Sequence, residues 1–454
     1  MRVAILSDTH FGDDLCTLVV EPPKGPPELG PAYPALARAV GRADYVVLLG
    51  DVLDFSVASF EKAYRHAKVF FTALQADGLA RQLIYIPGNH DFDIWNIVEH
   101  QVNVINQLKQ GELPRAFKRS VPGVIDDRRS DAADGLVLPR VTPNPEWHDT
   151  GAKYGNLFLD NITRVKSTRR GVRSEGRKLT FNFVYPNLYL VSDSGESVLV
   201  THGHYFEAYW ALASDWLMRI ASDALAVETP GQLNLQELVG MNLPLNQLAC
   251  TGIGQAEPLT ALVRKVQRDV GAGRLGEVAV FLDRLEARIL DDRAGTSRIR
   301  RAAERYVVRR IKLWVLGTLA AHPQARFSRL FLSRPSVRER FRRYYRHSLN
   351  ELSQLSRDHR IDVPPPSHVV FGHTHQPIPW GADELVDDID GHTVRFCNAG
   401  GWLLKDEADG EFVGAEVVVY ESGVGFRSHS VRGHDLAPAP LVPALSGAAE
   451  TRVG

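Results

Sequence analysis

The chain has 454 residues, of which 44% are hydrophobic and 24% are charged, and its formal net charge is −1. These values are ordinary for a globular protein of two or three domains, and no apolar run approaches the ~20 residues of a membrane span. Cys16, Cys250 and Cys397 are odd in number and far apart, so a disulfide framework is not indicated. The first strand is predicted within residues 1–8, so we expect no signal peptide and a cytoplasmic location, with peripheral membrane binding left open.

Three apolar segments in the first hundred residues end in side chains that can bind a metal. They are VAILSDTH (Asp8, His10), YVVLLGDVLD (Asp51, Asp54) and LIYIPGNHD (Asn89, His90, Asp91). Their Val/Ile/Leu/Tyr-rich pattern predicts buried strands. Between these strands, a Pro/Gly-rich loop is predicted at 22–34 and helices at 35–42 and 60–77.

The next part of the chain is predicted to contain loops and then a hairpin. Residues 123–176 are rich in Pro, Asp, Arg and Gly, which indicates long loops or weak strands. Residues 178–191 and 197–201 predict two paired strands with a turn at 193–195. The second of these strands ends in SVLVTHGH, which supplies His202 and His204.

Residues 206–365 interrupt the strand pattern with a long Leu/Ala/Arg-rich stretch of helical periodicity. Because this stretch lies between two ligand-bearing segments, we expect a helical insertion that emerges at the active-site edge as a cap or lid. A helix predicted from Phe206 to Val227 brings Trp210 and Trp216 near that edge. These side chains would line an apolar substrate channel or form the packing face of the cap.

Residues 293–346 are strongly basic, with sixteen Lys/Arg and only two acids, while the whole chain sums to −1. Arg301, Arg305 and Arg309 share one stripe of a predicted helix, and aromatic residues are interleaved along the stretch. Three interpretations stay open. The arginines form a solvated face, bind an anionic lipid or lipid-linked diphosphate at a membrane surface, or bind nucleic acid through phosphate contacts and stacking.

The strand pattern resumes after the insertion. The segment HVVFGHTH supplies His373 and His375, and further strands are predicted at 393–399 and 413–420. Residues 433–454 include APAPLVPALSGAAE, a low-complexity sequence that predicts a disordered tail.

The donor types point to a two-metal phosphoesterase site. In an open α/β sheet, ligands gather beyond the carboxyl ends of the strands, so the five segments would bring their donors to one edge. Carboxylate, amide and imidazole donors suit Mn²⁺, Fe or Zn²⁺ better than Ca²⁺, and we favour two Mn²⁺ ions. Any one of these motifs alone is typical of an ordinary loop, but five together favour a metal site. Asp51, at a sharp Gly-Asp strand exit, is the best candidate to bridge two ions ~3.5–4 Å apart.

These motifs resemble the calcineurin-like metallophosphoesterase family, whose pattern is D-x-H, G-D-x-x-(D/E), G-N-H-(D/E), a G/H-x-H segment and G-H-x-H. All five are present in that order, at 8–10, 50–54, 88–91, 202–204 and 372–375. The resemblance implies an α/β fold, a β-sandwich of mixed sheets flanked by helices, with the large helical insertion added. The expected catalytic core is therefore discontinuous, at 1–205 and 366–432, and the insertion occupies 206–365.

The resemblance also implies a role for each site residue. The first metal would be held by Asp8, His10, Asp51 and His375, and the second by Asp51, Asn89, His202 and His373. His90 is similar to the histidine that contacts the scissile phosphate and protonates the leaving group, and Asp91 would orient it and support its charge. Asp54 matches a carboxylate that supports the ligands from behind, and His204 matches a residue near the metals.

The leading hypothesis is an enzyme that hydrolyses a phosphate ester or diphosphate by in-line attack of metal-bound hydroxide. The bacterial enzymes that cleave a UDP-linked diacylglucosamine are similar in site pattern and carry a helical insertion, but this chain has G-N-H-D at 88–91. A nuclease of the double-strand-break repair type is an alternative, although coiled-coil heptads are not evident. A non-enzymatic scaffold is disfavoured because no ligand is missing. The sequence does not indicate the oligomeric state.

Overall fold

The computed structural model describes residues 1–129, 180–208, 210–211, 213–215, 234–247, 331–383, 385–405 and 410–436, together with residues 250, 255, 280, 283 and 309. The strands in this part of the chain are β1 Arg2–Leu6, β2 Val19–Val20, β3 Glu28–Leu29, β4 Ala43–Leu49, β5 Ala80–Ile86, β6 Gly123–Asp126, β7 Thr180–Phe183, β8 Asn187–Val191, β9 Ser197–Thr201, β10 His368–Phe371, β11 Val386–Ile389, β12 His392–Asn398, β13 Ala415–Glu421 and β14 Gly425–Val431. The helices are α1 Tyr33–Val40, α2 Phe60–Ala76, α3 Asp93–His100, the π-helix η1 Gln101–Ile105, α4 Asn106–Lys109, α8 Leu235–Gln247, α12 Pro335–His359 and the short 3₁₀ turns η3 His204–Phe206 and η5 Gly433–Asp435.

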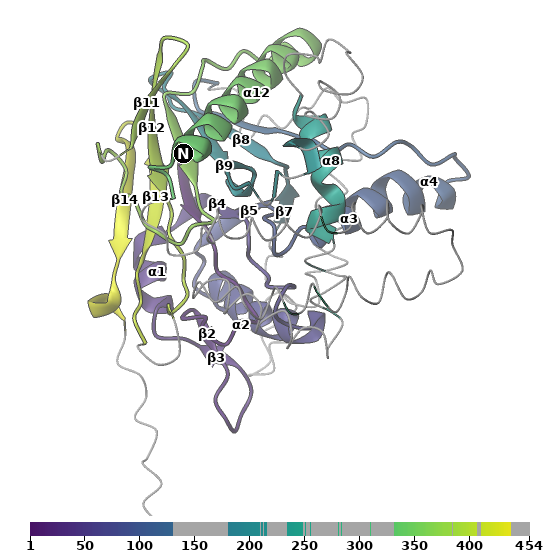
Figure 1. Cartoon of the computed structure of the whole chain (residues 1–454). Helices are drawn as coiled ribbons and strands as arrows, with labels where there is room; N and C mark the ends of the chain where they lie inside the picture. Colours follow the sequence, from purple (N-terminus) through teal and green to yellow (C-terminus); the bar gives the residue numbers. More distant parts are fainter. Residues whose placement is uncertain are drawn as a thin grey trace, which may run out of the picture.

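Across these residues the longer strands form two six-stranded sheets (Figure 1). The first sheet has the order β14-β13-β1-β4-β5-β7, and the second has the order β11-β12-β10-β9-β8-β6. Strands β1, β4, β5 and β7 run parallel, and β13 and β14 are antiparallel to their neighbours. In the second sheet β9, β10 and β12 run parallel. The sheets are therefore mixed, which confirms the predicted fold class.

The two sheets pack face to face through alternate residues of their strands. In β4, Val47 and Leu49 enter an inner apolar cluster, which also contains Val198 and Val200 of β9 from the other sheet. The intervening residue Leu48 belongs instead to the cluster on the outer side. This period of two is what a strand buried on both faces requires.

Helices cover the outer faces of the sandwich. Phe71 of α2 meets Phe181 of β7 with ring centroids 5.4 Å apart, and α2 begins at Ser59, whose side chain accepts a hydrogen bond from the Lys62 backbone N–H. On the other side, Phe341 of α12 meets Phe396 of β12 with ring centroids 4.1 Å apart. Figure 1 shows α12 above the strands of the second sheet and α2 below those of the first.

Helix α12 is tied into the second sheet by buried polar groups as well as by aromatic rings. The Glu351 carboxylate accepts hydrogen bonds from Ser120 Oγ (2.6 Å), Asn187 Nδ2 (2.9 Å) and Tyr189 OH (2.8 Å). Tyr344 OH donates to Asn187 Oδ1 at 2.7 Å. A buried carboxylate needs such donors, and burial raises the pKa of Glu351 despite them. The C-terminal part of 206–365 is thus integrated with the sheet, while the domain division itself stays a prediction.

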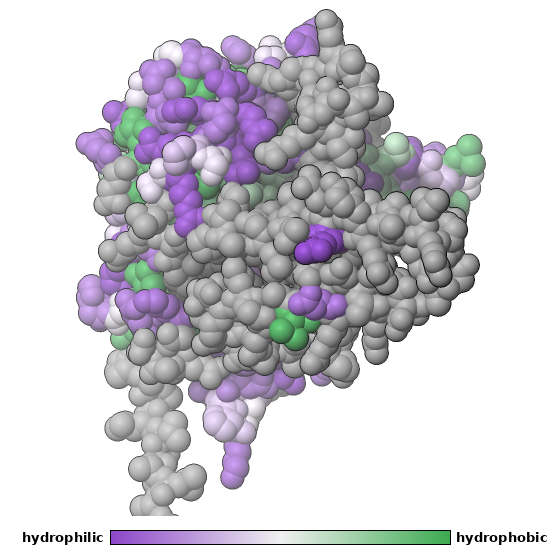
Figure 2. All heavy atoms as spheres, in the orientation of Figure 1, coloured by the Kyte–Doolittle hydropathy of each residue, from purple (hydrophilic) through white to green (hydrophobic). Residues whose placement is uncertain are grey.

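Several described arginines of the basic stretch pair with nearby acids. On α12, Arg342 and Arg346 each make a two-nitrogen contact with a carboxylate, to Asp387 and Asp390 respectively. Figure 2 shows hydrophilic residues gathered over α12 and the neighbouring β11. Residues 293–308 and 310–330 lie outside the described residues, so the stripe at Arg301 and Arg305 is not placed.

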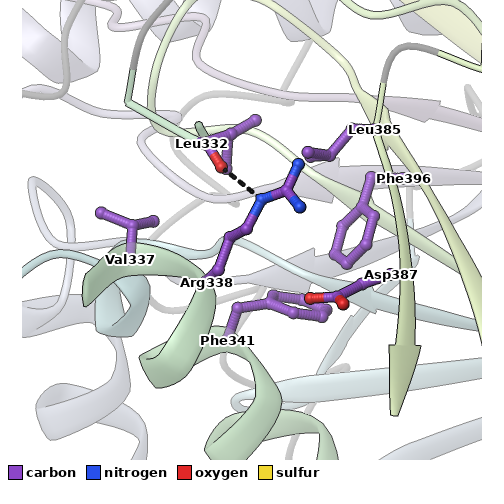
Figure 3. A pocket seen from close by; sticks show the side chains of 7 residues that line it. All are labelled: Leu332, Val337, Arg338, Phe341, Leu385, Asp387 and Phe396. Atoms are coloured by element: carbon purple, nitrogen blue, oxygen red, sulfur yellow. Dashed lines mark hydrogen bonds between the residues drawn. The ribbon is translucent and has the colours of Figure 1, made fainter. Parts of the chain in front are cut away.

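A small apolar pocket lies between the start of α12 and strands β11 and β12 (Figure 3). Its lining residues are Leu332, Val337, Arg338, Phe341, Leu385, Asp387 and Phe396. Arg338 Nε turns back to donate to the Leu332 carbonyl at 3.3 Å. None of the predicted site residues lines this pocket, so the pocket is separate from the predicted site.

The helices predicted at 35–42 and 60–77 are confirmed as α1 and α2, and the turn at 193–195 joins β8 to β9. The single strand predicted at 178–191 is wrong, because residues 180–183 form β7 in the first sheet and residues 187–191 form β8 in the second. Within 123–176, residues 123–126 form strand β6, which pairs with β8 in parallel. Residues 130–179, most of the helix predicted at 206–227 and the tail beyond 436 lie outside the described residues. Within the described part of the chain, no helix is both long enough and apolar enough to traverse a lipid bilayer.

Candidate metal centre

The predicted donors meet at one edge of the sandwich. They follow β1, β4 and β5 of the first sheet and β9 and β10 of the second. His10 Nε2 and His375 Nε2 lie 3.1 Å apart although the residues are 365 positions apart in the chain. All eleven site residues predicted from the sequence lie at this edge. Nine come from the first half of the chain, and His373 and His375 come from the second. The nine are Asp8, His10, Asp51, Asp54, Asn89, His90, Asp91, His202 and His204.

The first cluster consists of Asp8, His10 and His375, all of them buried. Asp8 Oδ1 lies 3.1 Å from His375 Nε2 and 3.7 Å from His10 Nε2. His10 Nδ1 faces Asp54 Oδ2 at 2.7 Å, and because an ionised carboxylate only accepts, Nδ1 carries the proton. In the neutral ring, the lone pair of His10 Nε2 therefore points into the cluster.

The second cluster consists of Asp51, His202 and His373, with Asn89 beside them. His202 Nδ1 donates to the Leu49 carbonyl at 3.0 Å, which leaves Nε2 as the lone-pair nitrogen of the neutral ring. That Nε2 lies 3.1 Å from Asn89 Oδ1 and 3.2 Å from Asp51 Oδ2. Three acceptor atoms that face one another in a buried site repel unless a cation or a proton lies among them. The donors present thus fit a divalent cation.

Asp51 joins the two clusters. Its Oδ2 atom lies 3.2 Å from His202 Nε2 in the second cluster and 3.8 Å from His10 Nε2 in the first. Its Oδ1 atom accepts a hydrogen bond from the His90 backbone N–H at 2.8 Å, which fixes the carboxylate. This placement is the one that the sequence predicted for a bridging carboxylate.

The backbone is strained where the ligands emerge. Asp8, His10, Asp51, His373 and His375 all have positive φ angles, between 48° and 66°. Residues other than glycine rarely adopt this left-handed conformation, which costs ~1–3 kcal/mol at each position. Five such residues at one edge lower the stability of the fold locally, and this conformation directs their side chains towards one another.

A glycine makes room for the first cluster. A Cβ atom at Gly372 would overlap Ser7 Oγ and the Asp8 carboxylate. Because strand ends on both sides are packed, neither group can move away. The glycine of the G-H-T-H motif is therefore required by the close approach of β1 and β10.

The Gly372→Ala variant should consequently fold less stably and bind metal more weakly. The added methyl group displaces Asp8, and overpacking of this kind costs ~1–3 kcal/mol. Thermal unfolding and metal titration check this expectation. A Gly433→Ala variant is the control for the loss of a glycine. Its φ, like that of Gly372, is not positive, and an added Cβ there meets only the Phe412 carbonyl oxygen, at 3.9 Å.

Comparison with known proteins agrees with this geometry. The calcineurin-like phosphoesterase family model matches residues 1–221. This part of the chain is similar to the calcineurin-like phosphoesterase family. No curated protein matches the chain. The match ends before His373 and His375, but the structure places both histidines in the same two clusters as the matched residues.

Several histidines of the candidate metal centre have shifted pKa values. Burial alone would lower the pKa of His10, but its contacts with Asp54 and Asp8 raise that pKa to about 10. Burial would also lower the pKa of His202, but the nearby Asp51 carboxylate raises that pKa to about 9. The pKa of Asp51 itself lies well below its usual range, because the surrounding histidines outweigh the effect of burial. At neutral pH the metal-free site therefore carries protons on imidazoles.

Metal binding should in consequence be accompanied by proton release. A metal ligand must be a neutral imidazole, so binding displaces the protons from His10 and His202, and affinity should rise as the pH increases from 6.5 towards 9. Calorimetric titration of Mn²⁺ in two buffers of different ionisation enthalpy measures the number of protons released. Equal heats in both buffers would contradict the proton assignment.

His90 lies on the exposed side of the site. Its Nδ1 atom is 2.9 Å from Asp54 Oδ1 and 2.6 Å from Ser56 Oγ, and its Nε2 atom is 4.0 Å from Asp51 Oδ2. Asp54 thus holds His10 with one oxygen and His90 with the other. Burial would lower the pKa of His90, but the charges of Asp54 and Asp51 raise it. The imidazole is therefore positioned and charged as a proton donor would be.

Asp91 does not make the contact that its position beside His90 suggested. Its carboxylate accepts hydrogen bonds from the backbone N–H groups of Val52 (2.7 Å) and Gly88 (2.6 Å) and from Tyr85 OH (2.6 Å). It therefore fastens the G-N-H-D loop to the G-D-x-x-D loop. Asp54 makes the contact with His90, so the orienting role expected of Asp91 belongs geometrically to Asp54.

His204 lies beside the metal clusters without belonging to any of them. Its ring centroid is 5.5 Å from that of His202, and its Nε2 atom is 3.4 Å from Tyr185 OH. Burial and the neighbouring histidine His202 hold the pKa of His204 well below its usual range. A neutral, buried imidazole at this place supports the ring of His202 by packing.

Three residues at the site were missed by the sequence reasoning. Ser56 bridges Asp54 and His90, and Glu207 contacts His373 Nε2 at 2.8 Å. Gln255, from the predicted insertion, donates to the carbonyls of Phe55 and Ala58 at 3.0 Å. Ser56 and Glu207 lie close to motif residues in the chain, and that proximity was their only sequence signal.

Proposed function

We propose that the chain is a two-metal phosphoesterase that hydrolyses a phosphate ester or diphosphate. The observation that carries this proposal is the position of Asp51, whose Oδ2 atom lies within 4 Å of a histidine nitrogen in each of the two buried clusters. Two divalent ions, when bound, neutralise phosphate charge and supply hydroxide from water near neutral pH. The family match over residues 1–221 and the two buried donor clusters support the same activity.

The site residues would bind the two ions, donate a proton and hold the loops in place. The first ion would be held by Asp8, His10, Asp51 and His375, and the second by Asp51, Asn89, His202 and His373. His90, held by Asp54 and Ser56, would place its Nε2 atom towards the substrate and give a proton to the departing oxygen. Asp91 would hold the G-N-H-D loop against the G-D-x-x-D loop through its hydrogen bonds to the Val52 and Gly88 backbone N–H groups.

The metal and the location are further parts of the proposal. Mixed carboxylate, amide and imidazole donors support Mn²⁺ over Ca²⁺, without excluding Fe or Zn²⁺. We propose a cytoplasmic enzyme. An anionic lipid or nucleic acid that bound at 293–346 would have to use residues other than Arg342 and Arg346, because these already pair with Asp387 and Asp390.

A substrate panel tests the function directly. Turnover is measured with Mn²⁺ and with excess EDTA on p-nitrophenyl phosphate, bis-p-nitrophenyl phosphate, a UDP-linked glycolipid and single-stranded DNA. We expect Mn²⁺-dependent hydrolysis of at least one substrate. EDTA-resistant hydrolysis, or no hydrolysis of any substrate by protein shown to bind two ions, would contradict the proposal.

The role of the insertion is tested with a shortened chain. Helix α12 is tied to the sheet, and Cys250 and Gln255 contact the loops at Asn89 and Phe55, so these parts should be kept. Replacing 256–330 with a short linker removes the remainder. If the shortened chain loses hydrolysis of one substrate only, the deleted segment is a specificity cap. If the rates on every substrate are unchanged, the deleted segment serves to dock a partner.

A further inference from the structure

Glu207 makes a close contact with a predicted metal ligand from outside the two clusters. Its Oε2 atom lies 2.8 Å from His373 Nε2, and both residues are only 8% exposed. Glu207 follows directly after the 3₁₀ turn His204–Phe206, at the start of the predicted insertion. A carboxylate in this place is neither one of the family's motif residues nor part of a donor cluster.

The chemistry of the contact fixes which nitrogen of His373 is protonated. An ionised carboxylate has no hydrogen to donate, so the proton between the two groups belongs to His373 Nε2. In the neutral ring, Nδ1 is then left as the only lone-pair donor. We propose that Glu207 positions His373 in this tautomer and thereby strengthens the binding of the second divalent ion, a role that rests on the proposed function.

The same arrangement occurs at two other histidines of the site. His10 Nδ1 faces Asp54 at 2.7 Å, and His202 Nδ1 faces the Leu49 carbonyl at 3.0 Å. In each case one ring nitrogen meets an acceptor, and the other is free to face the cluster. Such outer contacts orient a ligand and raise its basicity. Glu207 supplies this acceptor for His373 through a carboxylate oxygen.

The chain contains a matched carboxylate–histidine pair away from the metals. Glu196 Oε1 lies 2.9 Å from His368 Nδ1, and His368 is the first residue of β10, the strand whose other end leads to His373. The His368 ring stacks on Trp380 with centroids 4.2 Å apart. This pair is the natural control, because its removal deletes a similar contact at the opposite end of the same strand.

The experiment compares wild type with Glu207→Ala, Glu207→Gln and Glu196→Ala. Each protein is freed of metal and titrated with Zn²⁺ by calorimetry, and bound ions are counted by elemental analysis after dialysis. We expect two ions in wild type and in Glu196→Ala. Glu207→Ala should bind one of its two ions ~10–100-fold more weakly. Glu207→Gln should lie between, because its amide oxygen still accepts from Nε2 but carries no charge.

A spectroscopic readout separates positioning from a general loss of packing. In the Zn²⁺-loaded wild type, long-range ¹H–¹⁵N spectra should show His373 protonated at Nε2. Protonation at Nδ1 would overturn the proposal, as would Glu207→Ala and Glu207→Gln variants that both bind two ions with unchanged affinity. Glu207→Gln preserves size and one acceptor, so it remains informative if the alanine variant fails to fold. Wild type that binds no ion would instead refute the two-metal function.

Discussion

Replacing Asp51 with alanine is expected to remove both metal ions and to lower turnover by ~10³-fold or more, since several kcal/mol of charge stabilisation would be lost. The carboxylate is the only group within 4 Å of the ring nitrogens of both His10 and His202 among the described contacts. Its loss also leaves the His90 backbone N–H without its acceptor. Elemental analysis of the purified variant and kcat/KM on p-nitrophenyl phosphate measure the two effects.

The Asp51→Asn variant separates the charge of this side chain from its shape. The amide oxygen can still accept from the His90 backbone N–H, so the loop should keep its conformation. Without the negative charge, however, two divalent ions should repel each other more strongly, and we expect the variant to retain at most one ion. Wild-type hydrolysis together with two bound ions in Asp51→Ala would overturn the bridging assignment.

The sandwich and its metal edge could be predicted because their signals are local. Strands β1, β4, β5, β9 and β10 are largely apolar, and the first donor residue of each follows within three residues of its end. Parallel strands carry those residues to a common edge, so the convergence of His10 and His375 followed from the pattern without any knowledge of the intervening chain.

Contacts between the loops could not be predicted in the same way. Adjacency in sequence suggested that Asp91 orients His90, but the side chains of neighbouring residues in a tight loop diverge. Asp91 turns inward to backbone N–H groups, and His90 finds Asp54 thirty-six positions earlier. Glu207 is similarly separated by 166 positions from the His373 ring that it contacts. No local periodicity encodes such a pair.

Helix α12 shows a second limit of sequence reasoning. Its richness in arginine favoured a solvated or ligand-binding face, and its periodicity correctly predicted a helix. One face nevertheless packs in the core through Phe341, Tyr344 and Tyr345, and the buried Glu351 is satisfied by partners on distant strands. The arginines on the other side meet Asp387 and Asp390, acids that belong to β11 and the turn after it.

The second large effect is expected for His90→Ala, and it should depend on the leaving group. Without a proton donor, hydrolysis of an alkyl phosphate should slow by ~10²–10⁴-fold, whereas a p-nitrophenyl ester, whose leaving group needs little protonation, should slow much less. Metal content should stay at the wild-type level, because His90 is not among the ligands proposed for either ion and both clusters keep their donors. Rates on a series of esters with graded leaving-group pKa values measure the dependence.

The dependence of kcat on pH tests the same role of His90. The charges of Asp54 and Asp51 raise the pKa of His90 against the effect of burial, and the acid form is the one that donates. For alkyl phosphates, kcat should therefore fall as the pH rises through the pKa of His90, and the His90→Ala variant should lack this alkaline decline. Asp54→Asn removes the charge that raises the pKa and should move the decline to lower pH. Equal losses on good and poor leaving groups would show that His90 acts on the phosphate and not on the leaving oxygen.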